Sequence, residues 1–265
     1  FVSPDGDTRR FVAGASEIRL QGAEGLPARG LEPATRRGLV FSSVGSQCLP
    51  VVRDRWLDEP AAADFDVVLV HYGEEGSGVH RALQCLAREH DFVEVHQHRE
   101  FKWPNFRRWV EGMGGSEALA ARYDYVWVVD DDVRLGTEGI SALFALLRTR
   151  EHVQFACPSF DAESEGVWRY FDKHDPRCLL RYTDFVECTA PVVKTSMFLD
   201  PVFDRCLRAA YTGCFLDFCF HPAGGGRQDS MAIVDAVQCH HPARDEAAPS
   251  ELRALLPWED HKDDA

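Results

Sequence analysis

The sequence predicts an α/β domain in which a mostly parallel central sheet is flanked by helices. Short runs of β-branched and aromatic residues recur along the chain, which is the composition of strands covered on both faces. Segments with apolar residues at helical spacing separate these runs, and such alternation favours parallel strands joined by right-handed crossovers. The length of 265 residues, without internal repeats or a Gly/Ser linker, favours a single domain.

We place this domain at residues 38–242. The preceding residues 1–37 are rich in Arg, Gly, Ala and Pro and show little periodicity, so we expect a loosely ordered lead-in. Residues 243–265 are acidic and rich in Pro and Ala, which is typical of a mobile tail.

The first part of the domain alternates strands and helices. Residues 38–44, GLVFSSV, begin the sheet, and the small polar residues 45–47 suit either a turn beside a nucleotide or an ordinary strand-to-helix turn. Residues 65–72 predict a second buried strand. An amphipathic helix over residues 79–87 and a short strand at residues 92–95 follow.

A stretch of aromatic and basic residues comes next. FKWPNFRRW, residues 101–109, combines aromatic side chains with Lys102, Arg107 and Arg108. Its cations suit charge-assisted contacts with a diphosphate. Alternatively, the stretch is an aromatic helix start with a solvated basic face, the interpretation we favour for the two arginines.

Three consecutive aspartates organise the rest of the chain. The apolar strand Tyr125–Val129 ends in Asp130, Asp131 and Asp132, at the sheet edge where open α/β sheets bind ligands. Alternation along an extended strand would point the first and third carboxylates the same way. Two converging carboxylates require a cation between them, and oxygen ligands favour Mg²⁺ or Mn²⁺. The pattern favours a metal site that binds a phosphorylated substrate over a solvated acidic turn.

The pattern changes in the second half of the domain. Thr137 can cap a helix, and residues 153–158 predict the next strand. Residues 159–182 lose the alternation and are expected to cross the open sheet edge, where their aromatic residues either stack on sugar rings or pack a loop onto the core. Asp200 suits an N-cap before a helix, and the strand 231–239 runs into two histidines. We expect Gly213 to end the helix that begins after Asp200.

Two carboxylates lie in apolar segments. Glu187 falls within the strand-like residues 185–193, and Asp217 is the single charge in CFLDFCF. Burying an unpaired carboxylate costs several kcal/mol (about 2 or more), so Asp217 has either a structural partner or a catalytic task.

Composition excludes several classes of function. The formal net charge of −14 disfavours an extended nucleic-acid surface, so phosphate recognition requires a local site and a metal. No segment is long and apolar enough to span a bilayer, and no signal peptide is recognisable. The nine cysteines contain no CxxC pair, which argues against structural zinc and leaves open either disulfides in an oxidising lumen or reduced core thiols.

The motifs together resemble a family of glycosyltransferase-like proteins of the DUF707 type. The resemblance covers roughly residues 38–242 and rests on the order of GLVFSSV, FKWPNF, YDYVWVVDDDV, RYTDFVECTAPVV, CFLDFCF and AIVDAVQCHH. It implies a Rossmann-like GT-A fold, in which a metal on a D-x-D motif holds the diphosphate of a nucleotide-sugar.

The resemblance also implies roles for individual residues. Asp130 and Asp132 match the D-x-D pair, with Asp132 favoured as the direct ligand of Mn²⁺ or Mg²⁺, and His241, with His240 as the fallback, matches a late histidine that adds a metal contact. Contacts with the nucleotide-sugar donor fall to Ser43, Gly45, Lys102, Asp130 and Asp131.

The implied catalytic carboxylates are Asp217 and Glu187. Asp217 lies in a segment similar to the family's G-W-G-x-D-W, although Cys214 and Phe215 replace the W-G after Gly213, and Glu187 matches its F-V-E. We predict Asp217 as the general base that deprotonates the acceptor hydroxyl, with Glu187 second. A reaction that retains anomeric configuration requires no such base.

The sequence therefore predicts a metal-dependent glycosyltransferase, with a UDP-sugar donor favoured and a glycan or glycoprotein acceptor. One alternative is a catalytically silent carbohydrate-binding or scaffolding member of the same fold. A more distant one is a Mg²⁺-dependent phosphohydrolase of the haloacid dehalogenase type, which expects a small residue, Thr or Val where this chain has Arg134. The resemblance implies a Golgi or other secretory-pathway lumen in a eukaryote, and it allows a membrane anchor outside residues 1–265.

Overall fold

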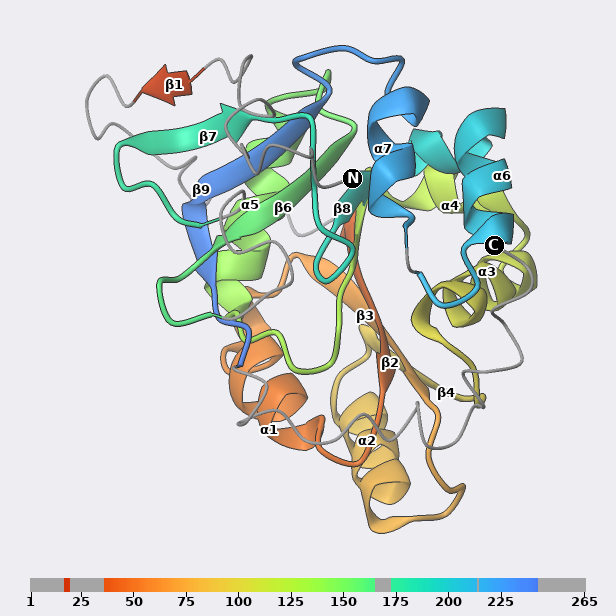
Figure 1. The fold of residues 1–265 in the computed structure, drawn as a ribbon. Helices are drawn as coiled ribbons and strands as arrows, with labels where there is room; N and C mark the ends of the chain where they lie inside the picture. Colours follow the sequence, from red (N-terminus) through yellow and green to blue (C-terminus); the bar gives the residue numbers. More distant parts are fainter. Residues whose placement is uncertain (1–16, 20–35, 165–172, 214, 243–265) are drawn as a thin grey trace, which may run out of the picture.

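A computed structural model describes residues 17–19, 36–164, 173–213 and 215–242. Its strands form one nine-stranded sheet in the order β1-β7-β9-β6-β8-β5-β2-β3-β4 (Figure 1). The strands are β1 (Glu17–Arg19), β2 (Gly38–Val44), β3 (Phe65–His71), β4 (Val93–Gln97), β5 (Tyr125–Val128), β6 (Phe155–Phe160), β7 (Cys178–Tyr182), β8 (Val192–Lys194) and β9 (Met231–Cys239).

Helices cover both faces of the sheet, as predicted (Figure 1). One buried cluster packs α1, α2 and α5 against the sheet, and the other packs α3, α4, α6 and α7 against the opposite face. The helices are α1 (Leu49–Val51), α2 (Gly78–Glu89), α3 (Lys102–Gly112), α4 (Ser116–Arg122), α5 (Thr137–Arg148), α6 (Pro201–Ala209) and α7 (Asp217–Ala223), with a π-helix at Val52–Trp56 and 3₁₀ turns at Pro60–Ala62 and Thr195–Leu199. Among the described residues, no helix meets the length and hydropathy that a membrane span requires.

The sheet is more mixed than predicted. Strands β4, β3, β2 and β5 run parallel, as do β6 and β9. However, β8 lies antiparallel between β5 and β6, and β7 lies antiparallel to β9 and to β1. The described residues between β6 and β8 contain no helix, and parallel pairing requires a long crossover, usually helical.

The helix starts show where local sequence is sufficient and where it is not. Asp200 caps α6 as predicted, because its Oδ1 accepts hydrogen bonds from the Val202 and Phe203 amides at 2.8 and 3.0 Å. Thr137 is not the cap of α5. It is the first helical residue, and its amide donates instead to Asp58 Oδ1 at 2.9 Å. Gly213 likewise does not end α6, which stops at Ala209.

The predicted terminal segments fall mainly outside the described residues. Within the lead-in 1–37, residues 17–19 form β1, which pairs with β7, and Arg37 binds Asp124 Oδ1 through its Nη2 at 2.6 Å. The predicted tail 243–265 lies outside the described residues, as do the aromatic residues Trp168, Tyr170 and Phe171.

Candidate functional site

The acidic residues lie at the carboxyl edge of the parallel strands, beside the end of β2. The Val129 amide donates to Phe41 O at 3.0 Å, and the Asp130 amide donates to Thr189 O at 3.0 Å. Ser42 Oγ donates to Val129 O at 2.8 Å, which fastens β2 to the end of β5 from the side. The start of the acidic run is therefore held by main-chain bonds on two sides.

The three carboxylates do not follow the strand alternation that the sequence suggested. Strand β5 ends at Val128, and the chain then turns, with the Val133 amide bonded to Asp130 O at 3.3 Å. In this turn Asp130 is directed to Lys102, Asp131 to Gly45 and Asp132 to His241. Within the described part of the chain, no group of three or more His, Cys, Asp or Glu residues converges as a ready-made metal site.

Lys102 occupies the first of these carboxylates. Its Nζ lies 2.6 Å from Asp130 Oδ1 and also donates to the carbonyls of Cys188, at 2.9 Å, and Thr189, at 3.3 Å. Its side chain is 12% exposed, so the ammonium group sits largely under the surface. The first turn of α3 therefore carries the cation that neutralises Asp130.

The second aspartate binds the turn after β2. The Gly45 amide donates to Asp131 Oδ2 at 2.7 Å. Burial raises the pKa of the Asp131 carboxyl to about 7, with a further increase from the charges of Asp132 and Asp130 and an opposing effect of the Gly45 bond. Two residues predicted to contact the donor thus bind each other in this structure.

The third aspartate retains an unused oxygen. Asp132 Oδ1 is buried and has no hydrogen-bond partner among the described residues. His241 Nε2 lies 3.7 Å from that oxygen. Burial raises the pKa of Asp132, opposed by the neighbouring His241. Asp132 supplies an oxygen ligand of the type that Mn²⁺ and Mg²⁺ prefer, and His241 adds an imidazole nitrogen, so these two groups fit part of the predicted metal site.

His241 reaches this position because the end of β9 pairs with the residues after the acidic turn. The Arg134 amide donates to His240 O at 2.7 Å, and the His240 amide donates to Arg134 O at 3.0 Å. The two histidines face different partners: His240 Nδ1 lies 2.9 Å from Asp161 Oδ2, whereas the His241 ring faces Asp132.

Asn105, which sequence analysis missed, links Ser43 of β2 to α3, the helix that carries Lys102. Asn105, which is 1% exposed, donates through Nδ2 to Ser43 Oγ at 2.9 Å and to Glu100 O at 2.8 Å. His98 Nδ1 lies 2.8 Å from its amide oxygen. Asn105 stands three positions after Lys102, and this i, i+3 spacing in the KWPN stretch was the available signal.

The predicted catalytic carboxylates lie near the Lys102 ion pair. Asp217 is the first residue of α7, is 8% exposed, and accepts a hydrogen bond from the Phe218 amide at 3.1 Å. Burial raises the pKa of Asp217. Glu187 is also buried, and its Oε1 accepts the Thr189 hydroxyl at 3.1 Å.

The Cys188 thiol connects these groups. Burial raises its pKa, as do the charges of Asp217 and Asp130, whereas Lys102 and a hydrogen bond from the Asp217 amide oppose the increase. Asp217, Lys102 and Asp130 therefore all lie close enough to Cys188 to shift the pKa of its thiol.

The segment before Asp217 departs from the family pattern in sequence and keeps a glycine-like conformation. Phe215 has a φ of 66°, the left-handed region that glycine favours, and it stands where the family pattern has Gly. Its ring is 71% exposed and lies beside Phe218, with centroids 6.3 Å apart. Cys214 lies outside the described residues.

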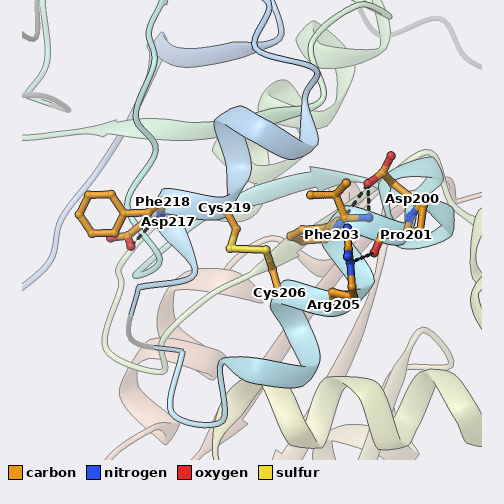
Figure 2. Close-up of a disulfide and its surroundings, with 9 residues drawn as sticks. Asp200, Pro201, Phe203, Arg205, Cys206, Asp217, Phe218 and Cys219 are labelled. Atoms are coloured by element: carbon orange, nitrogen blue, oxygen red, sulfur yellow. Dashed lines mark hydrogen bonds between the residues drawn. A yellow bond between two sulfur atoms is a disulfide. The ribbon is translucent and has the colours of Figure 1, made fainter. Parts of the chain in front are cut away.

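A disulfide anchors α7 to α6. Cys206 and Cys219 are bonded, and Figure 2 shows the bridge between the two helices, with Asp217 two residues before Cys219. Of the two states that the cysteine pattern left open, the structure therefore contains at least one disulfide.

A cavity of about 370 Å³ lies between the edge strand β4 and α3. Its lining includes Asn105 and the exposed Arg108 but none of the three consecutive aspartates. The cavity is lined by Val70, Glu94, His96, Gln97, His98, Asn105, Arg108, Trp109, Gly112, Met113 and Arg122.

Comparisons with known proteins identify the fold. No protein-family model matches the sequence, and no curated protein matches it either. S. aureus TarS 1-349 in complex with UDP is similar with a TM-score of 0.53 and 11% identity, over 78% of this chain and 60% of that chain. The mannosyltransferase PcManGT from Pyrobaculum calidifontis, in complex with GDP-Man and Mn²⁺, gives 0.51 and 12%, over 82% and 60%.

The chain thus spans about 60% of the length of these solved chains. At this identity the likeness concerns the fold alone, and no family model supports the DUF707 resemblance. The described residues form a mixed α/β fold that is similar to the fold of these two solved structures.

Proposed function

We propose that this protein is a metal-dependent glycosyltransferase that moves a sugar from a nucleotide-sugar, preferably a UDP-sugar, to a hydroxyl of a glycan or glycoprotein. The observation that carries the proposal is the buried Asp132 Oδ1, which faces His241 at the carboxyl edge of a GT-A-like sheet and has no hydrogen-bond partner among the described residues. UDP in the TarS complex and GDP-Man with Mn²⁺ in the PcManGT complex support the ligand class.

Asp132 and His241 would hold Mn²⁺ or Mg²⁺, whereas Asp130, the other carboxylate of the predicted pair, has its Oδ1 engaged by Lys102 in this structure. A bound divalent ion neutralises the charge that develops on the leaving nucleoside diphosphate. Lys102 holds Asp130 in place through its 2.6 Å ion pair. The Gly45–Asp131 bond fixes the turn after β2 against the acidic turn.

Asp217 accepts the proton of the acceptor hydroxyl in this proposal. A carboxylate whose pKa is raised by burial is a stronger base than a solvated one, and the raised pKa of Asp217 therefore suits general-base catalysis. Glu187 is the second candidate. It is buried and lies two residues before Thr189, and the Thr189 carbonyl accepts a hydrogen bond from Lys102.

The Cys206–Cys219 disulfide supports an oxidising compartment, such as the Golgi or another secretory-pathway lumen. The excess of acidic residues supports a sugar or glycan partner rather than a nucleic acid.

The test is release of UDP or GDP from a panel of nucleotide-sugars, with glycan acceptors, in Mn²⁺ and in chelator. We expect one donor to be consumed only with metal, and Asp132→Asn to abolish consumption. Asp204→Asn is the matched control, because Asp204 lies on α6 in an exposed pair with Arg208.

A silent carbohydrate-binding or scaffolding role is the alternative. The departure from the pattern of the resembled family at Phe215 supports it. Metal-dependent nucleotide binding without turnover of any donor would identify that role. Release of inorganic phosphate from phosphate esters would identify the phosphohydrolase.

A further inference from the structure

Asp161, directly after β6, gathers hydrogen bonds from the residues that surround His241. Its Oδ1 accepts the Ser164 amide at 2.7 Å, the Ser164 hydroxyl at 2.7 Å and the Glu163 amide at 3.1 Å. Its Oδ2 lies 2.9 Å from His240 Nδ1. The Asp161 amide itself donates to Cys239 O at 3.0 Å. One side chain therefore ties the end of β6 to the end of β9.

The bond that reaches His241 passes through Ser164. The His241 amide donates to Ser164 Oγ at 2.9 Å, and the same hydroxyl donates to Asp161 Oδ1. Asp161 thus fixes the ring of His240 directly and the main chain of His241 through one hydroxyl. The amide bond to Ser164 holds the His241 main chain, and the His241 ring faces Asp132.

Lys173, which precedes β7, binds the turn formed by residues 161–164. Its Nζ donates to Asp161 O at 2.7 Å and to Ser164 O at 2.5 Å, so one ammonium group gathers the carbonyls of the turn. A cation bound by carbonyls at both ends of a four-residue turn holds the turn in a single conformation.

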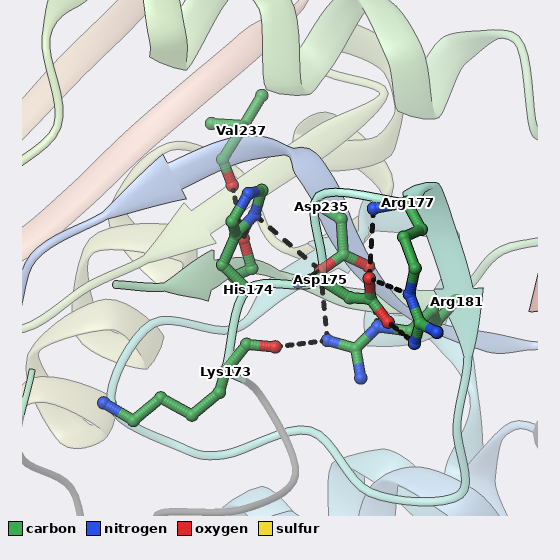
Figure 3. A network of polar contacts seen from close by, with 8 residues as sticks. Lys173, His174, Asp175, Arg177, Arg181, Asp235 and Val237 are labelled. Atoms are coloured by element: carbon green, nitrogen blue, oxygen red, sulfur yellow. Dashed lines mark hydrogen bonds and ion pairs between the residues drawn. The ribbon is translucent and has the colours of Figure 1, made fainter. Parts of the chain in front are cut away.

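Lys173 is positioned in turn by a buried ion pair. Figure 3 shows Arg181 of β7 between Asp235 and the main chain of Lys173. Arg181 Nε lies 2.7 Å from Asp235 Oδ2, and its Nη2 donates to Lys173 O at 2.5 Å. The Asp235 side chain is fully buried in β9. A chain of polar contacts therefore runs from the sheet to the turn that contains Asp161.

We propose that Asp161 is a positioning residue that holds His241 toward Asp132, so that the pair is arranged before a metal binds. The inference rests on the proposed function and extends it to a residue outside every motif of the sequence. Partners that orient a metal ligand without touching the metal commonly change metal affinity when they are removed. Asp161 would act on His241 in this way through the Ser164 hydroxyl, which accepts the His241 amide.

The experiment is calorimetric titration of Mn²⁺ into the full chain, with UDP or GDP present, for wild type and Asp161→Asn. We expect Asp161→Asn to weaken Mn²⁺ affinity by about 10-fold to 100-fold. Asp175→Asn is the matched control. The Asp175 side chain pairs with the exposed Arg177 rather than with His240 or His241, so Mn²⁺ affinity should stay unchanged.

A double-mutant cycle separates positioning from general destabilisation. In a His241→Ala background, Asp161→Asn should cause no further loss of Mn²⁺ affinity, because the group that it positions is absent. Ser164→Ala provides a milder second variant, which removes only the hydroxyl that binds the His241 amide and should also weaken Mn²⁺ binding.

The outcomes distinguish this inference from the proposed function. Wild-type protein that binds Mn²⁺ while Asp161→Asn binds it equally well overturns the positioning role alone. If Asp161→Asn causes the same loss of Mn²⁺ affinity in wild type and in the His241→Ala background, that result also overturns it. Wild-type protein that binds no Mn²⁺ with either nucleotide overturns both proposals.

Discussion

Lys102 Nζ lies 2.6 Å from Asp130 Oδ1, while Asp132 Oδ1, two residues later, is buried without a hydrogen-bond partner in the described structure. Neighbouring aspartates of one turn therefore have different tasks. A lysine neutralises the first, and the third is available for a cation. This division is the basis of the functional proposal.

The Lys102 ion pair should contribute to stability. Lys102→Met removes the donor to Asp130 and to two main-chain carbonyls, and we expect the free energy of unfolding to fall by about 1–3 kcal/mol. Lys194→Met, which removes a single bond to Glu151 O near the surface, should cost less than about 1 kcal/mol. Urea denaturation measures both, and equal losses would show that Lys102 has no special structural role.

The buried Asp235–Arg181 pair gives the largest predicted loss. Asp235→Ala leaves the Arg181 guanidinium partly buried without its carboxylate, and we expect about 3–5 kcal/mol of destabilisation. Asp204→Ala breaks the exposed pair with Arg208 and should change stability by less than about 1 kcal/mol. Thermal and urea denaturation should rank the two variants in this order, and a reversed ranking would contradict the assigned burial.

The left-handed backbone at Phe215 predicts an unusual ranking of two small residues. Phe215→Gly and Phe215→Ala both remove the exposed ring, but only Ala keeps a Cβ at a φ of 66°. The glycine variant should be more stable than the alanine variant by about 1 kcal/mol, because an L-residue in this region is strained. Elsewhere alanine is usually the more stable of the two. An alanine variant that is the more stable would place this residue in another conformation.

The disulfide should stabilise the helix that carries Asp217. Cys206 and Cys219 are 13 residues apart, and closing a loop of this length contributes about 3 kcal/mol in the chain-entropy model. Replacing both with serine should lower stability by about that amount in oxidising buffer and very little in reductant. Cys85→Ser, at an exposed cysteine outside the bridge, is the control and should have no effect in either buffer. If Cys85→Ser lost stability while the double serine variant did not, the result would contradict the bridge.

Local sequence was sufficient for the elements whose signals are local. The buried strands β2 and β3 begin and end within a residue of the predicted ranges, because their apolar runs are continuous. The Asp200 cap depends on its own two following amides and was predicted correctly. The edge position of the three aspartates follows from β5 being a central strand that runs parallel to β2.

Contacts between distant segments could not be predicted in the same way. The directions of Asp130 and Asp132 are set by a turn and by partners far away in the chain, Lys102 and His241. Thr137 was taken for a cap because Asp58, which fills that role, is 79 residues away. Asp161 belongs to no motif, and the roles of Asn105 and Asp161 depend on hydrogen bonds that only the folded chain forms.

The most direct test is calorimetry of UDP and GDP binding, with and without Mn²⁺, to wild type and Asp132→Asn. The account predicts that one nucleotide binds wild type only when Mn²⁺ is present and that Asp132→Asn weakens this binding by at least about 100-fold. Binding that is independent of the metal or unaffected by Asp132→Asn would contradict the assignment of the metal to Asp132. Absence of binding to either nucleotide under all conditions would contradict the glycosyltransferase proposal itself.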